Sequence, residues 1–350
     1  MKKLFIVVLC AFNYNLFCQD TVKVASQLTP DQQAELDYNS GLEKLKTNDY
    51  TSAIDFFTKS ITNKPTFDKA LINRAVALTR AKRYTEATSD INAVIKLTPQ
   101  NADAYFTKSL IFFEENKKDS QLVALDKCIG INPNHADASY YKGLLLYETG
   151  EYKAAVESYS KAILAKADYA YAYNDRASAK RAMNDLAGAI ADYEKAISLD
   201  PNQAFVYNNL GSAYRENKNL PKAIESYDKA LQTNPKYFIA QNNRGATRLE
   251  NGSAKNAQMD FEEVLKKDPN NSAAYNGLAS VYIKTKEYQK AKNMADKAIQ
   301  LNAKNGPAYY NRGIARQMLR EEEGSCQDWK KAFELGVTAA KSFINGDCSE

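Results

Sequence analysis

The chain has 350 residues, of which 44% are hydrophobic and 25% charged, and a formal net charge of +5 at pH 7. This composition is typical of a soluble globular protein, and it excludes a disordered chain and a membrane protein with several spans. The charge is too small to indicate a nucleic-acid partner, which usually requires clustered Lys and Arg.

Residues 1–18 have the pattern of a secretory signal peptide. Two lysines precede an apolar run, residues 4–12, that is shorter than the roughly 20 residues needed to cross a bilayer. Cys18 before Gln19 provides a cleavage point, whereas lipid attachment at Cys18 is less favoured because the residues just ahead of it are large. We expect an exported protein, periplasmic or secreted, with an outer-membrane lipoprotein as the alternative and no membrane span.

Residues 19–33 form a short lead-in to the rest of the chain. Thr29 is followed by Pro30 and, three residues after the threonine, by Gln32. A threonine followed by a first-turn proline and a glutamine three positions on is the sequence of a helix start closed by a capping box. We therefore expect the first helix to begin here.

Prolines recur at a spacing of 34 residues along most of the chain. They are Pro65, Pro99, Pro133, Pro201, Pro235 and Pro269, with Ala167 and Ala303 at the two remaining points of the grid. This period sets nine repeats within residues 34–339, and positions are counted below from their first residues, 34, 68, 102, 136, 170, 204, 238, 272 and 306. A proline disfavours helix in the residue before it, so each one marks the end of a repeat.

Small and large side chains alternate at fixed positions of the repeat. Position eight is Gly, Ala or Ser in all nine repeats, and position twenty is alanine in all but two, which have Gln121 and Ser325. Position twenty-four is large except at Ala295. Short polar turns such as TNDY, TGEY and TKEY lie between these positions. The pattern predicts two helices per repeat that cross closely where a side chain is small.

With its 34-residue period, small positions and closing prolines, the segment 34–339 resembles the tetratricopeptide repeat family. The resemblance implies an all-α, right-handed α-solenoid of tandem helix-turn-helix repeats. It also implies that the first helices line a concave groove, with positions two, five, six, nine, twelve and thirteen facing it. Residues 340–350 are expected to form a capping helix and tail.

An arginine at position seven accompanies an aspartate sixteen residues later in four repeats. The pairs are Arg74 with Asp90, Arg176 with Asp192, Arg244 with Asp260, and Arg312 with Asp328. In the other five repeats neither residue is present. Because a guanidinium can hold a carboxylate through two parallel hydrogen bonds, we expect structural ion pairs between the two helices.

Three cysteines follow the predicted signal peptide. Cys128 occupies a position where other repeats have alanine, so we expect a small buried side chain. Cys326 begins the last second helix and Cys348 follows a short returning helix, which should bring the two together. In an oxidising compartment we expect a disulfide between them, with two free thiols as the alternative.

The resemblance divides the expected groove into two halves. The first is aromatic and aliphatic and includes Phe106, Phe113, Tyr140 and Tyr147. The second carries a ladder of asparagines, with two arginines at position twelve: Asn174, Asn208, Asn209, Asn242, Asn243, Asn276, Arg181 and Arg215. Because asparagine both donates and accepts hydrogen bonds, the ladder could hold the backbone of an extended peptide. The alternatives are asparagines that are merely solvated and aromatic side chains that pack between repeats.

Catalysis is not expected. The single histidine, His135, falls between repeats, and the chain has no phosphate-binding glycine loop and no CxxC motif. Leucine and valine at position nine of the early repeats give no support to the carboxylate clamp of some members of the family. We therefore expect a non-enzymatic interaction scaffold for a protein or peptide, without cofactor or metal. The alternative is a glycan or cell-wall binding module, and the oligomeric state stays open.

Overall fold

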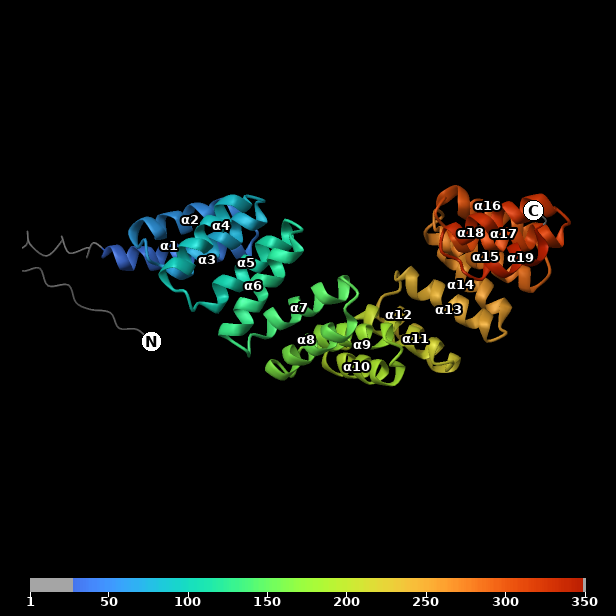
Figure 1. Cartoon of the computed structure of the whole chain (residues 1–350), viewed down its shortest axis with the longest axis horizontal. Helices are drawn as coiled ribbons and strands as arrows, with labels where there is room; N and C mark the ends of the chain where they lie inside the picture. Colours follow the sequence, from blue (N-terminus) through green and yellow to red (C-terminus); the bar gives the residue numbers. More distant parts are fainter. Residues whose placement is uncertain (1–27, 349–350) are drawn as a thin grey trace, which may run out of the picture. The chain divides into compact units, whose positions relative to one another are not determined.

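The computed structural model describes residues 28–348, so the predicted signal peptide lies outside the described residues. Nineteen α-helices follow one another in these residues, with no strand among them (Figure 1). The chain divides into two compact units with the boundary between Pro133 and Asn134. They are called the N-terminal and the C-terminal unit below.

The N-terminal unit contains three helix pairs. Its helices are α1 (Pro30–Lys46), α2 (Tyr50–Asn63), α3 (Asp68–Arg80), α4 (Tyr84–Leu97), α5 (Ala102–Glu114) and α6 (Lys118–Ile131). The predicted start of α1 is confirmed: Gln32 N–H donates to Thr29 Oγ1 at 3.2 Å, and Thr29 N–H donates to Gln32 Oε1 at 2.9 Å. Because this cap lies ahead of residue 34, α1 is longer than the other first helices.

The C-terminal unit contains six helix pairs and a final single helix. They are α7 (Ala136–Glu148), α8 (Tyr152–Ala165), α9 (Ala170–Ala182), α10 (Leu186–Leu199), α11 (Ala204–Glu216), α12 (Leu220–Thr233), α13 (Phe238–Glu250), α14 (Ala254–Lys267), α15 (Ser272–Lys284), α16 (Tyr288–Leu301), α17 (Gly306–Met318), α18 (Glu322–Glu334) and α19 (Ala340–Asp347). His135 caps α7, because its Nδ1 accepts a hydrogen bond from Ala138 N–H at 3.1 Å.

Every helix pair turns at position fifteen, where the backbone takes the left-handed conformation. These residues are Asn48, Lys82, Asn116, Gly150, Asn184, Lys218, Gly252, Lys286 and Arg320. Only two are glycines, so seven residues with a Cβ adopt this conformation at a cost in conformational energy.

The two helices of a pair cross where position eight meets position twenty-four. A Cβ on Gly143 would lie 2.6 Å from the ring of Tyr159, and one on Gly211 would lie 2.7 Å from the ring of Tyr227. Both rings are at most 1% exposed. The predicted close crossing is therefore confirmed, and it sets the core of each repeat. Cys128 is also buried and free, as expected, and burial raises the pKa of its thiol to about 12.

No helix in residues 28–348 is both long enough and apolar enough to cross a membrane.

Candidate partner-binding face

The first helices of successive repeats contact one another. In the C-terminal unit α7 contacts α9, and the same contact recurs from α9 to α11, α11 to α13, α13 to α15 and α15 to α17. In the N-terminal unit α1, α3 and α5 do the same. The second helices make no comparable contacts with each other in the described residues. In a curved stack of repeats, the helices on the inner side are closer together than those on the outer side. The first helices therefore form the inner face of each unit.

All four arginine–aspartate pairs lie within hydrogen-bonding distance. In each, Nε and Nη2 of the arginine donate to the two carboxylate oxygens of the aspartate. The distances are both 2.7 Å in Arg74–Asp90 and Arg176–Asp192, 3.2 and 2.5 Å in Arg244–Asp260, and 2.9 and 2.6 Å in Arg312–Asp328. The aspartates are 2 to 7% exposed. The pairs are bidentate and largely removed from water.

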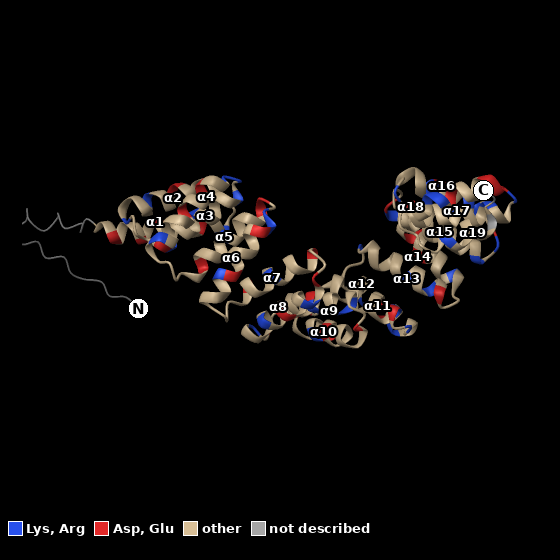
Figure 2. Ribbon diagram, in the orientation of Figure 1, with Lys and Arg blue, Asp and Glu red and all other residues tan. Residues whose placement is uncertain are grey.

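Each of these arginines also reaches a third helix, which the sequence analysis missed. Its Nη1 donates to a residue of the preceding repeat, sixteen positions earlier: Thr58 at 3.1 Å, Ser160 at 3.0 Å, Asp228 at 2.6 Å and Asp296 at 2.7 Å. Burial by itself would lower the pKa of Arg244, but Asp260 and Asp228 hold it above its ordinary value. The arginine row therefore joins repeats as well as helices, and Figure 2 shows the mixed charges of α13 to α18.

The end of the C-terminal unit is closed by α19. Its Phe343 ring lies 4.7 Å from that of Trp329 on α18 and 5.7 Å from that of Tyr310 on α17. Cys326 and Cys348 are joined by a disulfide, with a Cα–Cα distance of 5.6 Å. Gly336, with a φ of 91°, follows the C-terminal end of α18 and separates it from α19.

The asparagine ladder forms hydrogen bonds between neighbouring first helices. A position-six side chain donates through Nδ2 to Oδ1 of the position-five asparagine one repeat earlier. The bonds are Asn209 to Asn174 at 3.2 Å, Asn243 to Asn208 at 2.9 Å and Asn311 to Asn276 at 2.7 Å. These inter-repeat asparagine bonds brace α9 against α11, α11 against α13 and α15 against α17.

One bond of this series is missing, at Asn242. Position six of the next repeat is Gly277, which has no side chain, and a Cβ there would overlap the ring of Phe261. Oδ1 of Asn242 is consequently buried without a hydrogen-bond partner, although its Nδ2 donates to Asn271 Oδ1 at 3.2 Å. Packing of the Phe261 ring thus excludes the asparagine that would complete the series.

The asparagines of the ladder are only partly accessible to solvent. Asn174 and Asn208 are only 5% and 7% exposed, because the neighbouring repeat covers them and uses their Oδ1 atoms. Within the described residues no hydrogen bond occupies Nδ2 of Asn208 and Asn276, or Oδ1 of Asn209 and Asn243. Each of these four side chains therefore has one polar atom that is available to a ligand.

The two arginines expected to bind a partner are also engaged within the chain. Arg215 Nε lies 2.8 Å from Glu250 Oε2, and Arg181 Nε lies 3.8 Å from Glu216 Oε2. In both cases position twelve of one repeat meets position thirteen of the next. Their charges are thus partly neutralised by neighbouring acids.

The aromatic residues of the predicted groove fall in both units and do not behave alike. Phe113 in the N-terminal unit is 49% exposed and Phe106 is half-buried, while Tyr147 in the C-terminal unit is 37% exposed. Tyr140 instead packs between repeats: its ring centroid is 4.9 Å from Tyr169, and its hydroxyl donates to Asp175 Oδ2 at 2.7 Å. For Tyr140 the packing alternative therefore describes the observed side chain.

Asp175 lies where α7 meets α9, among several tyrosines. It also accepts a hydrogen bond from Asn174 Nδ2 at 2.8 Å. Burial raises the pKa of Asp175 even though the bonds from Tyr140 and Asn174 oppose the shift. A carboxylate with donors on two sides yet a raised pKa is short of compensating positive charge.

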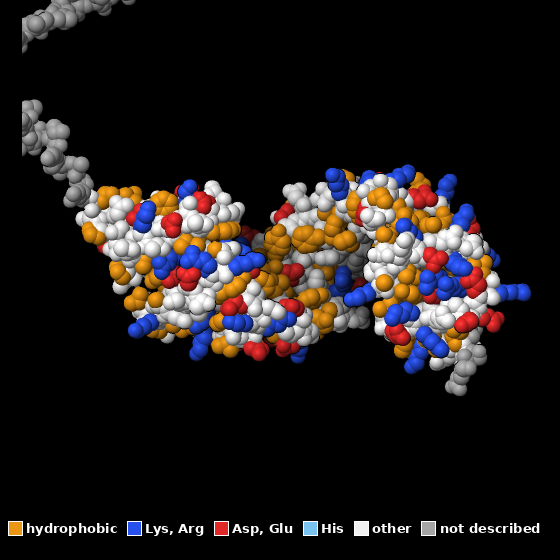
Figure 3. Space-filling view, turned by 90° about the horizontal axis from the view of Figure 1, so that it is seen from above, with side chains coloured by type: hydrophobic (Ala, Val, Ile, Leu, Met, Phe, Trp, Pro, Cys, Tyr) orange, Lys and Arg blue, Asp and Glu red, His pale blue; other side chains and the backbone are white. Residues whose placement is uncertain are grey.

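Sequence reasoning missed an apolar stripe at position two. Tyr171 and Ile239 are 49% and 57% exposed, and the ring of Tyr171 stacks at 6.2 Å on that of Phe205 between them. Figure 3 shows hydrophobic side chains gathered on one face over α7 to α12. Apolar residues at position two of three consecutive repeats were the available signal.

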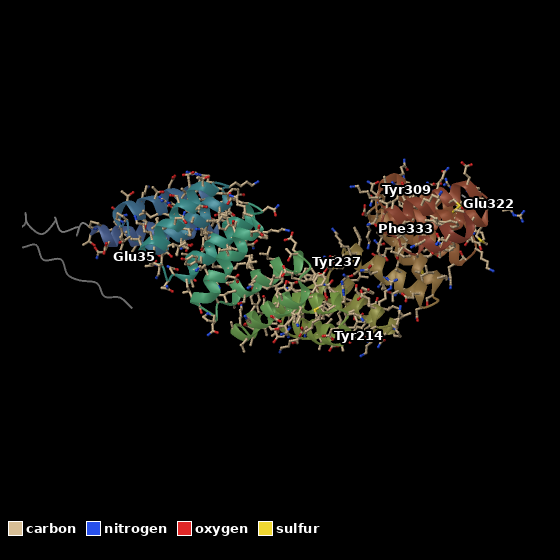
Figure 4. All side chains as sticks on the ribbon, viewed as in Figure 1. Glu35, Tyr214, Tyr237, Tyr309, Glu322 and Phe333 are labelled. Carbon is tan, nitrogen blue, oxygen red and sulfur yellow. A yellow bond between two sulfur atoms is a disulfide. The ribbon has the colours of Figure 1, made fainter. Side chains whose placement is uncertain are left out.

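Tyr214 of α11 contacts the second helices α10 and α12. Tyr214, labelled on α11 in Figure 4, is 8% exposed and donates its hydroxyl to Glu194 of α10 at 2.7 Å. Lys222 of α12 lies 5.2 Å from its ring centroid. Among the described residues no group of three or more His, Cys, Asp or Glu side chains could hold a metal ion.

Sequence models of the tetratricopeptide repeat match most of the chain. They cover residues 38–102, 102–135, 120–172, 177–217, 204–237 and 248–311. No curated protein matches the sequence.

Solved structures share the fold. A tetratricopeptide repeat protein from Parabacteroides merdae is similar with a TM-score of 0.63 at 20% identity, over 70% of this chain and 97% of that one. The APC/C hetero-tetramer Cut9–Hcn1 is similar with a TM-score of 0.55 at 16% identity, over 92% of this chain and 67% of that one.

Proposed function

Because the chain belongs to the tetratricopeptide repeat family, whose fold is that of a protein–protein interaction scaffold, we propose that it is a non-catalytic scaffold. Its ligand is an extended peptide segment of a protein partner. The site is the inner face of the C-terminal unit.

The observation that carries this proposal is the set of open polar atoms on the asparagine ladder. The amides of Asn208 and Asn276 have a free donor, and those of Asn209 and Asn243 a free acceptor. An extended peptide presents N–H and C=O groups along its length, and these are the complementary partners. Because backbone groups are common to all sequences, the ladder fixes the path of the peptide rather than its sequence.

The apolar stripe of Tyr171, Phe205 and Ile239 lies on the same row of helices and supplies contact area. A contiguous group of exposed apolar side chains is typical of a binding surface. The stripe provides apolar contacts beside the hydrogen bonds of the ladder, so peptide side chains of ordinary hydrophobic character fit here.

The test begins with peptides selected from a random library on the purified full chain. Their dissociation constants are then measured with the variant Asn208→Asp/Asn276→Asp. Aspartate keeps an oxygen that accepts from Asn243 or Asn311 and replaces the open donor by a charged carboxylate oxygen, so the brace between repeats survives. The matched control is Asn217→Asp/Asn251→Asp, the same chemical change at exposed helix ends.

We expect at least a tenfold loss of affinity in the ladder variant and less than a twofold change in the control. Equal affinities of the two variants would contradict the proposal. Saturable binding of oligosaccharides that depends on Tyr140 and Tyr147, without peptide binding, would favour a glycan or cell-wall module instead.

Export is part of the same proposal, and it rests on the signal-peptide pattern of residues 1–18. The full chain is produced in a bacterial host and the cells are fractionated. The mass of the exported form is then measured by intact-protein mass spectrometry. A chain that begins at Gln19 is the expected product. A lipid-modified Cys18 would make the protein a lipoprotein, and a full-length chain in the cytoplasm would contradict export.

A further inference from the structure

A buried tyrosine hydroxyl on α8 lacks the partner that its equivalents have. At the same position of the next two repeats, Tyr193 pairs with Ser178 at 2.9 Å and Tyr227 with Ser212 at 3.2 Å. Where those serines stand, the repeat of Tyr159 has Leu144. The Tyr159 hydroxyl is fully buried and has no hydrogen bond within the described residues.

The nearby carboxylate of Asp175 lacks a cation. The neighbouring bases on α9 are occupied elsewhere, since Arg176 and Lys180 both lie 2.7 Å from Asp192. No Lys, Arg or His of the described residues lies within 4.0 Å of Asp175. Burial raises the pKa of Tyr159, and the charge of Asp175 adds to the effect, so hydroxyl and carboxylate share one electrostatic environment.

Tyrosine rings flank this carboxylate. The Tyr140 centroid is 4.9 Å from that of Tyr169 and 5.8 Å from that of Tyr159, and Tyr169 donates its hydroxyl to Asp137 at 2.9 Å. Ring faces attract cations, and Lys166 Nζ of the chain itself already lies 4.7 Å from the Tyr169 ring centroid. An anionic or purely apolar group would leave Asp175 uncompensated and Tyr159 unpaired.

We infer that Asp175, Tyr140, Tyr159 and Tyr169 form a site for a basic side chain, lysine or arginine, of the bound peptide. The inference rests on the function proposed above and adds a sequence requirement to it. The cation would pair with Asp175, lie against the tyrosine rings and give the Tyr159 oxygen a donor. This part of the inner face would then select the partner, while the asparagine ladder holds its backbone.

The test uses the library-selected peptides and the variant Asp175→Asn. Asparagine has the shape of aspartate and can still bond Tyr140 and Asn174, but it carries no charge. Each lysine in a peptide is replaced by norleucine, and each arginine by citrulline. Glu225→Gln, an equal change of charge on the exposed side of α12, is the control.

We expect the peptides to share one basic position, whose neutral replacement weakens binding about tenfold or more to the wild type and to Glu225→Gln. In Asp175→Asn the same replacement should matter less than twofold. Peptides that depend on the ladder but show no basic position, or whose basic residue matters equally in Asp175→Asn, overturn this inference and leave the proposed function standing. Absence of all peptide binding overturns both.

Discussion

The asparagines of the first helices illustrate how one side chain serves two contacts. Asn208 accepts from Asn243 through Oδ1 and keeps its Nδ2 open, and Asn276 does the same with Asn311. Since an amide has two donors and an acceptor oxygen with two lone pairs, bracing a repeat does not exhaust it. The same residues therefore contribute to stability and to the proposed recognition. The two contributions are separated only by substitutions that change the open polar atom and keep the one that braces the repeats.

The unpaired Tyr159 hydroxyl predicts opposite effects for two chemically identical substitutions. Tyr159→Phe removes a buried group that has no partner, so the free energy of unfolding should stay the same or rise by up to about 1 kcal/mol. Tyr193→Phe removes the group bonded to Ser178 and should lower it by about 1 kcal/mol. Thermal denaturation followed by circular dichroism compares the two, and equal losses would show that Tyr159 is bonded after all.

The raised pKa of Asp175 predicts a pH-dependent stability difference. In the folded protein this carboxyl keeps its proton at pH values where the unfolded chain has lost it. Stability is therefore lost as the pH rises from the ordinary pKa of about 4 through the raised one. Asp175→Asn should melt at a higher temperature than the wild type at pH 7 and at the same temperature near pH 3. Because the two proteins share all other acidic groups, the difference between their melting temperatures reports on Asp175 alone. A variant less stable than the wild type at pH 7 would contradict the account.

The arginine–aspartate pairs predict a large penalty for removing one partner. Asp192→Asn leaves the partly buried Arg176 and Lys180 against a neutral amide, which should cost about 3 kcal/mol. In the double variant Arg176→Leu/Asp192→Asn much of this penalty should disappear. Thermal melts of the single and double variants measure the coupling, and strictly additive losses would show that the pair is not coupled.

Co-occurrence in the sequence was enough to predict these pairs, because Arg and Asp appear and vanish together at one spacing. The third contact of each arginine could not be predicted, since the partner sixteen positions earlier is of three different types: Thr58, Ser160, Asp228 and Asp296. The burial of Asn174 and Asn208 was equally hidden. The sequence does not show whether an asparagine side chain contacts water or a neighbouring repeat.

At the scale of elements, proline spacing and small positions were sufficient to place the helix pairs. The crossing of Gly143 and Tyr159 follows from sequence because a small residue and a large one must meet for two helices to pack closely. The apolar stripe of Tyr171, Phe205 and Ile239 was predictable, since position two is expected to face the groove and is apolar in three consecutive repeats.

The closing disulfide predicts that α19 depends on it. Cys326 and Cys348 close a loop with a sequence separation of 22, which is worth on the order of 3 kcal/mol by chain entropy. In Cys326→Ser/Cys348→Ser, amide hydrogen exchange should speed up in α18 and α19, whereas α9 to α12 should be unchanged. Each repeat contacts mainly its neighbours, so the effect stays local. Unchanged protection of α19 would show that Phe343 and its aromatic neighbours hold it alone.

At the scale of the whole molecule, repetition explains why the fold was predictable and the partner was not. Nine copies of one pattern determine the architecture many times over, whereas recognition depends on the few departures from the pattern. Tyr159, whose repeat has Leu144 where the next two repeats have serine, and Gly277 in place of asparagine are two such places. Each leaves one buried polar atom without a partner, and its significance emerges only when neighbouring repeats are seen together.

The central claim is that the asparagine ladder holds a peptide by its backbone, and backbone methylation tests it most directly. One selected peptide is made with a single N-methyl group at each position in turn, beside an alanine scan, and every dissociation constant is measured. We predict large losses at the N–H groups that meet the oxygens of Asn209 and Asn243, and small losses from alanine outside the basic and apolar positions. Tolerance of N-methylation at every position, with strong dependence on side chains alone, would contradict the account.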